Sequence, residues 1–75
     1  GYKKFLIKPV LGGTLTYAKA ETKTSYGIIK SDWKIENNKF KLSVTVPYGC
    51  EAKIVLPNGD TFIRTHGEYL FENDL

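Results

Sequence analysis

The sequence contains a single cysteine, a single histidine and no methionine. One cysteine excludes an intramolecular disulfide, and Cys50 together with His66 supplies too few ligands for a zinc site of four protein side chains. Small domains often depend on such links, because a core of this size rarely contributes more than about 3–5 kcal/mol of net stability. We therefore expect one domain, residues 1–75, that holds no metal or other cofactor and gains stability from a larger partner surface.

Long apolar runs are also missing. No segment approaches the roughly 20 apolar residues that span a bilayer, and no apolar signal-peptide region precedes a small-residue cleavage site. These absences predict a soluble chain with no membrane partner, but they do not indicate its compartment. Because the sequence opens on Gly1 without a methionine, we expect that it was excised from a longer polypeptide.

A concentrated positive charge is absent as well, although the net charge is +3. The 11 basic residues are spread from Lys3 to Arg64 and are interleaved with eight acids. Lys39 and Lys41 flank Phe40 in strand alternation, which is typical of a solvated sheet face rather than of a phosphate-binding stripe. Composition therefore does not predict a nucleic-acid partner.

What the sequence does contain is strict alternation of apolar and polar residues. Residues 39–46 alternate throughout, which predicts a strand with one buried face, and residues 29–36 show the same period with Trp33 near the centre. Asn37-Asn38 lies between the two segments. Asparagine tolerates positive φ, which both central residues of a tight hairpin turn require, so we predict a two-residue hairpin here.

The rest of the chain follows the same scheme of short strands and turns. Strands are predicted at residues 5–7, 16–24, 52–56, 61–64 and 69–71, and turns at Gly12-Gly13, at 57–60 and at His66-Gly67. No window shows the recurrence of apolar residues that a helix requires. We predict an all-β domain, a small antiparallel β-sandwich of roughly seven short strands, while periodicity alone leaves a small barrel open.

Candidate catalytic residues are poorly supported. Glycoside hydrolysis, for example, needs a pair of carboxylates at a fixed separation in a cleft. The acids lie on predicted strand surfaces, in turns or in the tail, where a role in surface solubility is enough to explain each of them. They are Glu21, Asp32, Glu36, Glu51, Asp60, Glu68, Glu72 and Asp74. His66 stands at a corner with no recognisable nucleophile motif, and Cys50 at a strand start serves as a small hydrophobe. We predict no catalytic residue.

Aromatic residues fall into two groups. The apolar strand phases, and hence the predicted core, include Trp33, Phe40, Phe62 and Phe71. Tyr17 is in phase with Lys19 rather than with Ala18, so its ring is predicted to point outward, and Tyr2, Tyr26 and Tyr48 are further candidate surface rings. Exposed rings can contact a neighbouring domain or a sugar. Tyr2 and Tyr17 are our candidates for docking, which we favour, or for sugar contact.

Several short segments resemble one known family over essentially the whole chain. They are, in order, Gly1 to Pro9, Leu15 to Ala20, Ser25 to Ile29, Trp33, Asn37 to Phe40, Leu42 to Pro47, Ala52 to Pro57 and Gly67 to Tyr69. Their order and spacing resemble the C-terminal domain of bacterial α-L-rhamnosidases of glycoside hydrolase family 78. The stretch from Tyr26 to Trp33, followed by Val44-Thr45-Val46-Pro47, is the most specific part.

The resemblance implies an antiparallel sandwich that follows an all-helical α/α barrel. In the family the barrel carries the acids that hydrolyse terminal α-L-rhamnosides with inversion, and no catalytic residue transfers to a position in this chain. The expected partner is thus the catalytic barrel of the parent enzyme. The first hypothesis for function is a structural accessory domain that stabilises this barrel.

Two other functions remain open at this stage. A carbohydrate-binding module would need several outward rings on one face, and a small barrel that binds single-stranded nucleic acid is suggested only by the pI near 9.0 and the aromatic content. An unpaired edge strand would also allow the isolated chain to form a homodimer.

Overall fold

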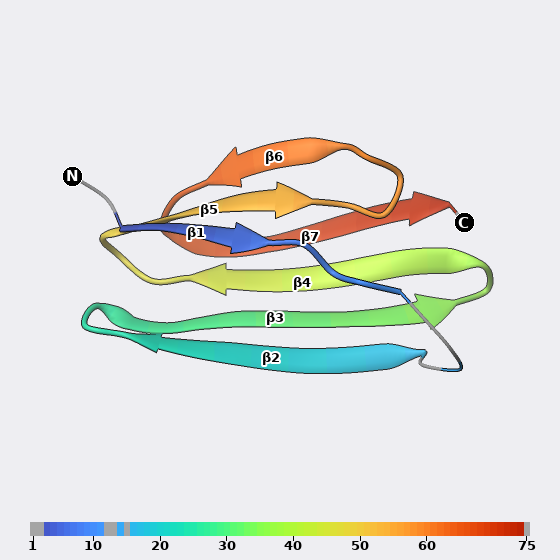
Figure 1. Cartoon of the computed structure of the whole chain (residues 1–75), viewed down its shortest axis with the longest axis horizontal. Helices are drawn as coiled ribbons and strands as arrows, with labels where there is room; N and C mark the ends of the chain where they lie inside the picture. Colours follow the sequence, from blue (N-terminus) through green and yellow to red (C-terminus); the bar gives the residue numbers. More distant parts are fainter. Residues whose placement is uncertain (1–2, 12–13, 15, 75) are drawn as a thin grey trace.

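The computed structural model describes residues 3–11, 14 and 16–74. Seven strands and no helix occur there: β1 (Lys3–Ile7), β2 (Tyr17–Thr24), β3 (Gly27–Glu36), β4 (Lys39–Val46), β5 (Cys50–Val55), β6 (Thr61–Arg64) and β7 (Gly67–Asp74). They form a four-stranded sheet in the order β2-β3-β4-β7 and a three-stranded sheet in the order β1-β5-β6 (Figure 1). The predicted all-β sandwich of seven strands is confirmed.

The central hairpin forms as predicted. Asn37 and Asn38 have φ values of 54° and 61°, so both central residues take the left-handed conformation of a tight two-residue turn. The turn sets the register of β3 and β4, in which Glu36 lies opposite Lys39 and Trp33 opposite Leu42. Alternation then places the apolar residues of both strands on one face, and this face becomes one wall of the core.

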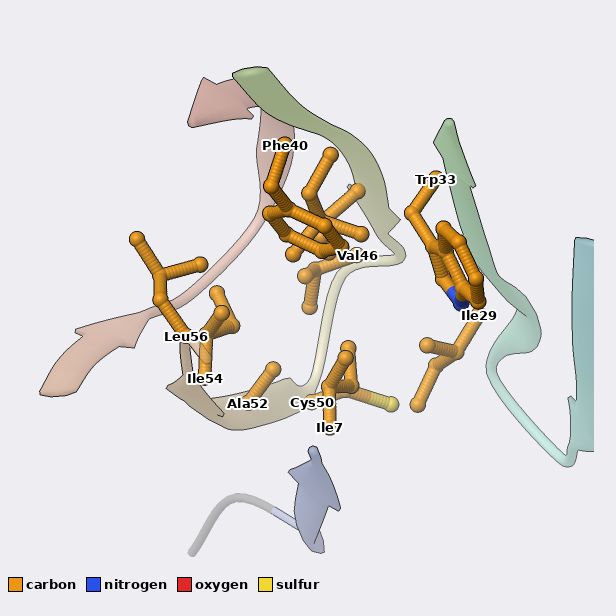
Figure 2. Close-up of a cluster of buried hydrophobic side chains, with 11 residues drawn as sticks. Ile7, Ile29, Trp33, Phe40, Val46, Cys50, Ala52, Ile54 and Leu56 are labelled. Carbon is orange, nitrogen blue, oxygen red and sulfur yellow. The ribbon is translucent and has the colours of Figure 1, made fainter. Parts of the chain in front are cut away.

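The core lies between the two sheets (Figure 2). From the four-stranded sheet, the apolar residues of β4 are almost fully buried, and the rings of Trp33 and Phe40 lie 5.7 Å apart between centroids. From the other sheet, β5 contributes Cys50, Ala52 and Ile54, all fully buried, which confirms Cys50 as a small buried hydrophobe. The buried residues are Ile7, Ile29, Trp33, Phe40, Leu42, Val44, Val46, Cys50, Ala52, Ile54 and Leu56.

One strand pair differs from the predicted antiparallel arrangement. β1 runs parallel to β5, with Lys3 opposite Cys50 and Ile7 opposite Ile54. Parallel neighbours need a long crossover, and here the chain passes through β2, β3 and β4 before it returns to β1. Alternation shows which face of β1 is buried, but it does not show which strand lies beside it or in which direction that strand runs.

The strand bounds agree with the sequence patterns to different degrees. The strands at 39–46 and 61–64 have the predicted bounds, and the last strand, predicted to carry Tyr69 and Phe71 on one face, is β7. The predicted turn at Gly12-Gly13 lies outside the described residues, as does Tyr2.

One side of the sandwich is closed by aromatic rings and an arginine. The guanidinium carbon of Arg64 on β6 lies 5.2 Å from the ring centroid of Phe62, 5.7 Å from that of Tyr69 and 5.6 Å from that of Phe71. Stacking of this kind keeps the charge at the surface while the rings pack inward. Phe62 and Phe71, predicted as core residues, are therefore only partly buried, because they lie at this border and pack against the core from its side.

Candidate docking surfaces

The outer face of the four-stranded sheet carries an open groove of about 640 Å³. We call it the Tyr17 groove; it is lined by Tyr17, Lys19, Asp32, Trp33, Lys34, Lys41, Leu42, Ser43, Leu70, Phe71 and Glu72. The register across the sheet brings Tyr17, Lys34, Lys41 and Glu72 into one row. Tyr17 is 65% exposed, so the prediction that its ring points outward is confirmed. Docking or sugar contact through this ring stays a prediction.

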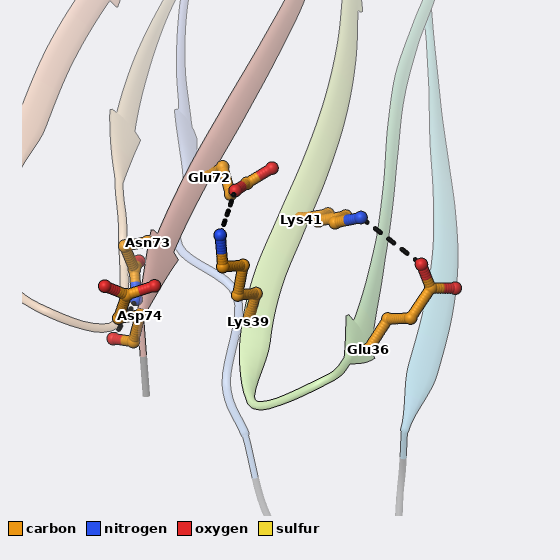
Figure 3. A network of polar contacts seen from close by, with 6 residues as sticks. All are labelled: Glu36, Lys39, Lys41, Glu72, Asn73 and Asp74. Atoms are coloured by element: carbon orange, nitrogen blue, oxygen red, sulfur yellow. Dashed lines mark hydrogen bonds and ion pairs between the residues drawn. The ribbon is translucent and has the colours of Figure 1, made fainter.

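The acids of the groove are not arranged as a catalytic pair. Asp32 and Glu72 both line it, but they lie on an open sheet face among Lys19, Lys34 and Lys41. Glu72 Oε1 is 3.4 Å from Lys39 Nζ, an exposed ion pair (Figure 3). A general acid of a glycosidase needs a dry, apolar enclosure that favours its protonated form, and a groove bordered by lysines does not supply one.

The outer face of the three-stranded sheet carries a more apolar surface, which we call the Leu6 face and which consists of Leu6, Lys53, Val55 and Ile63. Lys53 lies between Leu6 on β1 and Ile63 on β6 in the register. Leu6 is 64% exposed and Ile63 57% exposed. Two aliphatic side chains therefore flank a lysine whose methylene stem can extend the apolar area.

His66 and Cys50, which were considered from the sequence for catalysis and metal binding, lie apart from both surfaces. His66 is exposed at the corner between β6 and β7, with its ring centroid 4.9 Å from that of Tyr48. Cys50 is fully buried in the core. Across the part of the chain that the structure describes, no three residues among His, Cys, Asp and Glu gather into a group that could hold a metal ion, and no helix is long and apolar enough to span a bilayer.

The comparisons with known proteins agree with the family resemblance. Residues 1–71 match the family model described as the bacterial α-L-rhamnosidase C-terminal domain. The chain belongs to this family. An α-L-rhamnosidase of Formosa agariphila is 38% identical over 56 residues, which is 75% of this chain and 6% of the relative. One from Streptomyces avermitilis is 29% identical over 76 residues, which is 99% of this chain and 7% of the relative.

This rhamnosidase C-terminal domain thus spans only 6–7% of the length of these curated relatives. An α-L-rhamnosidase of Alteromonas sp. is 37% identical over 57 residues, and these again make up 6% of the relative. No solved structure matches the chain.

Sequence reasoning missed the Leu6 face and Leu70 of the rhamnosidase domain. Leu70 is 84% exposed in the Tyr17 groove, and a signal was present, because the alternation that places Tyr69 and Phe71 on the inner side places Leu70 outside. No comparable signal exists for the Leu6 face. Its row forms only because β1 and β6 both pair with β5, which alternation within one strand does not reveal.

Charge pairs lie at the turn end of the β3–β4 hairpin in this domain. Lys41 Nζ donates to Glu36 Oε1 at 3.3 Å (Figure 3), and Lys34 Nζ lies 3.5 Å from Glu36 Oε2. The hydrogen bond from Lys41, followed by the charge of Lys34, lowers the pKa of Glu36 below its usual range. A carboxyl whose pKa is lowered by folding stabilises the fold above its unfolded pKa, and this contribution disappears as the pH falls through the folded pKa.

Replacing Lys41 with methionine is therefore expected to raise the pKa of Glu36 toward its usual range. The shift is measured by NMR titration of the side-chain carboxyl, and the effect on stability is expected to be small because the pair is exposed. Lys53→Met on the other sheet is the control and should leave Glu36 unchanged. An unaltered Glu36 titration in Lys41→Met would show that the ion pair does not form in solution.

Proposed function

We propose that this domain is a non-catalytic part of a bacterial α-L-rhamnosidase that packs against the catalytic α/α barrel and stabilises it. The Leu6 face carries the proposal. Leu6 and Ile63 keep more than half of their area in water, although both lie in regular strands of a small sheet. Large aliphatic side chains that stay exposed close together on a sheet surface, here on either side of the Lys53 stem, are typical of an interface between domains. The membership of the family and the small share of its relatives that the chain spans support the same view.

The rest of the molecule is consistent with an accessory role. No charged or polar residue is buried among the described residues, whereas catalytic acids are often tuned by burial. The Tyr17 groove supplies a single exposed aromatic ring among its described side chains, together with charges of both signs. A sugar platform of the usual kind stacks several rings on one face, so the groove supports sugar binding less well than the Leu6 face supports docking.

The experiment compares the melting of the complete rhamnosidase polypeptide with that of a Leu6→Ser, Ile63→Ser double variant by differential scanning calorimetry. Full burial of a leucine or isoleucine side chain contributes about 1.5–3 kcal/mol. The double variant is therefore expected to destabilise the complete protein by about 3 kcal/mol or more and to lower its melting temperature. In the isolated domain the same substitutions should have little effect, because both side chains are already in water.

Leu70→Ser is the matched control, because it removes a still more exposed leucine from the opposite sheet. It should leave the melting of the complete protein unchanged. Removal of the whole domain should lower the melting temperature at least as much as the double variant. Unchanged melting after both the double substitution and the deletion would contradict the bracing role.

A further inference from the structure

The side of the sandwich opposite to Arg64 is open. The four-stranded sheet has one strand more than its partner, and this additional strand, β2, lies beyond β3 at the border of the sheet (Figures 1 and 2). Ala18, Ala20 and Thr22 alternate on its inner side, yet Ala20 and Thr22 are exposed and Ala18 is only half-buried. In a sandwich this inner side normally packs on a facing strand.

A groove of about 210 Å³ occupies this position between β1 and β2; we call it the β1–β2 mouth. Its wall consists of Leu6, Ile7, Lys8, Pro9, Ala18, Lys19, Ala20, Thr22, Ile29, Ser31 and Trp33. Ile7, Ile29 and Trp33 belong to the buried core and form an apolar floor. The alanines leave room above this floor for larger side chains from outside.

The edge of β1 at this mouth carries the backbone groups that bind a strand. In the described part of the chain β1 pairs with β5 alone. The Lys3 amide donates to Gly49 O at 3.0 Å, so the peptide groups of Lys3 point to β5. Peptide groups alternate in direction along a strand, and those of Lys4 and Leu6 therefore point to the free edge. A row of N–H and C=O groups recognises an extended polypeptide rather than a sugar.

The charge around the mouth indicates which side chains this polypeptide would carry. Lys8 and Lys19 stand at the rim of the mouth, and Lys3, Lys4 and Lys23 lie on the same two strands. The salt bridges found among the described residues all lie elsewhere, at Lys34, Lys39 and Lys41. A segment that alternates apolar residues with acids would place the apolar side chains over Ala18 and Ala20 and the acids on the outer side, near Lys4 and Lys8.

We propose that an extended acidic segment of the rhamnosidase polypeptide, lying outside residues 1–75, adds to the free edge of β1 as a fourth strand. It closes the β1–β2 mouth and gives both sheets equal numbers of strands. The inference deepens the proposed function, on which it rests, because it names the form of one contact with the remainder of the enzyme. The relatives are long enough to supply such a segment, since this domain covers 6–7% of them.

A second copy of the chain fits the edge less well. Pairing β1 with β1 of another copy would set lysines against lysines, and the border strand β2 also carries Lys19 and Lys23. β7 is the acidic border strand, with Glu68, Glu72 and Asp74, but β1-to-β7 pairing is head-to-tail and produces open chains rather than a closed dimer.

The test is hydrogen–deuterium exchange of the complete polypeptide, with the isolated domain as reference. The amides of Phe5 and Ile7 are bonded to β5 in both samples, whereas those of Lys4 and Leu6 gain a partner only from an added strand. We expect the Lys4 and Leu6 amides to exchange at least about tenfold more slowly in the complete polypeptide. Exchange of these two amides at the same rate in both samples overturns the proposal.

Ala20→Trp fills the mouth and should return the Lys4 and Leu6 amides to fast exchange in the complete polypeptide. Glu21→Trp is the matched control, because it places the same side chain one residue further on the opposite face of β2, where protection should persist. Ala20 is exposed, so the variant domain should fold alone, and its circular dichroism checks this. Reversal of charge on the β1 side, Lys4→Glu with Lys8→Glu, should also accelerate exchange of the Leu6 amide.

The outcomes separate the two proposals. If the Leu6 and Ile63 substitutions lower the melting temperature while Lys4 and Leu6 exchange freely, the domain docks without strand addition and only this inference fails. If protection appears only as protein concentration rises, the strand comes from a second copy, and the inference is again overturned. Protection that is independent of concentration and lost in Ala20→Trp supports it.

Discussion

Replacing Phe40 with alanine is expected to unfold most of the isolated domain at 25 °C. The Phe40 side chain is 0% exposed and packs its ring against Trp33 in the centre of the core. Truncation of a buried phenylalanine to alanine costs about 3–5 kcal/mol, because it removes transfer free energy and leaves a cavity. A core of this size supplies about the same amount in total, so no margin remains. Circular dichroism and urea titration measure the loss.

Leu70→Ala is the control for Phe40→Ala, because it also removes part of a large apolar side chain from the same sheet but at a position 84% exposed to water. Its free energy of unfolding should stay within about 0.5 kcal/mol of the parent domain. Phe40→Leu should fall between the two, since it retains part of the buried volume. A Phe40→Ala domain that melts like the parent would show that the two sheets do not pack as the structure has them.

The second large effect is expected for Gly49→Ala, immediately before β5. Gly49 has a φ of +87°, a conformation that residues with a Cβ rarely adopt. A Cβ placed there would lie 2.7 Å from Cδ1 of the Tyr26 ring and 3.0 Å from its Cγ, so the ring would have to move. Backbone strain of this kind costs about 1–3 kcal/mol, and the displaced ring adds to it. The free energy of unfolding from urea titration measures the sum.

Gly59→Ala separates the two causes. Gly59, in the predicted 57–60 turn, has a similar φ of +96°, but an added Cβ would meet no atom within 4 Å. Gly59→Ala should therefore show the backbone cost alone, and Gly49→Ala should exceed it. Equal losses at the two positions would mean that the Tyr26 ring moves aside without cost.

Local patterns predicted much of this fold. The alternation of β4 identified its buried face residue by residue, and Asn37-Asn38 identified the turn, because both features depend on neighbours in the chain. The partners of β1 and the unequal number of strands in the two sheets could not be predicted in this way. Pairing between Ile7 and Ile54 joins distant parts of the chain, and periodicity carries no information on which strands become neighbours.

The same distinction applies to the candidate surfaces. The outward position of Tyr17 follows from its phase with Lys19, so the sequence predicted it. The Leu6 face needs β1 and β6 on either side of β5, and the β1–β2 mouth needs one sheet to extend beyond the other. Both arise from the assembly of strands, and no motif in the sequence marks them.

The complete burial of Cys50 gives the domain a built-in reporter of its own opening. A thiol reagent added to the folded protein has no access to the sulfur, which lies between the sheets and 3.8 Å from Thr24 Oγ1. Alkylation must wait for the sheets to separate, and the sequence offers no other thiol that could react instead. When opening is fast and rare, the labelling rate is the rate of the free thiol multiplied by the fraction of molecules that are open. A single mass increment on Cys50 thus reports the fraction of domain molecules that are open.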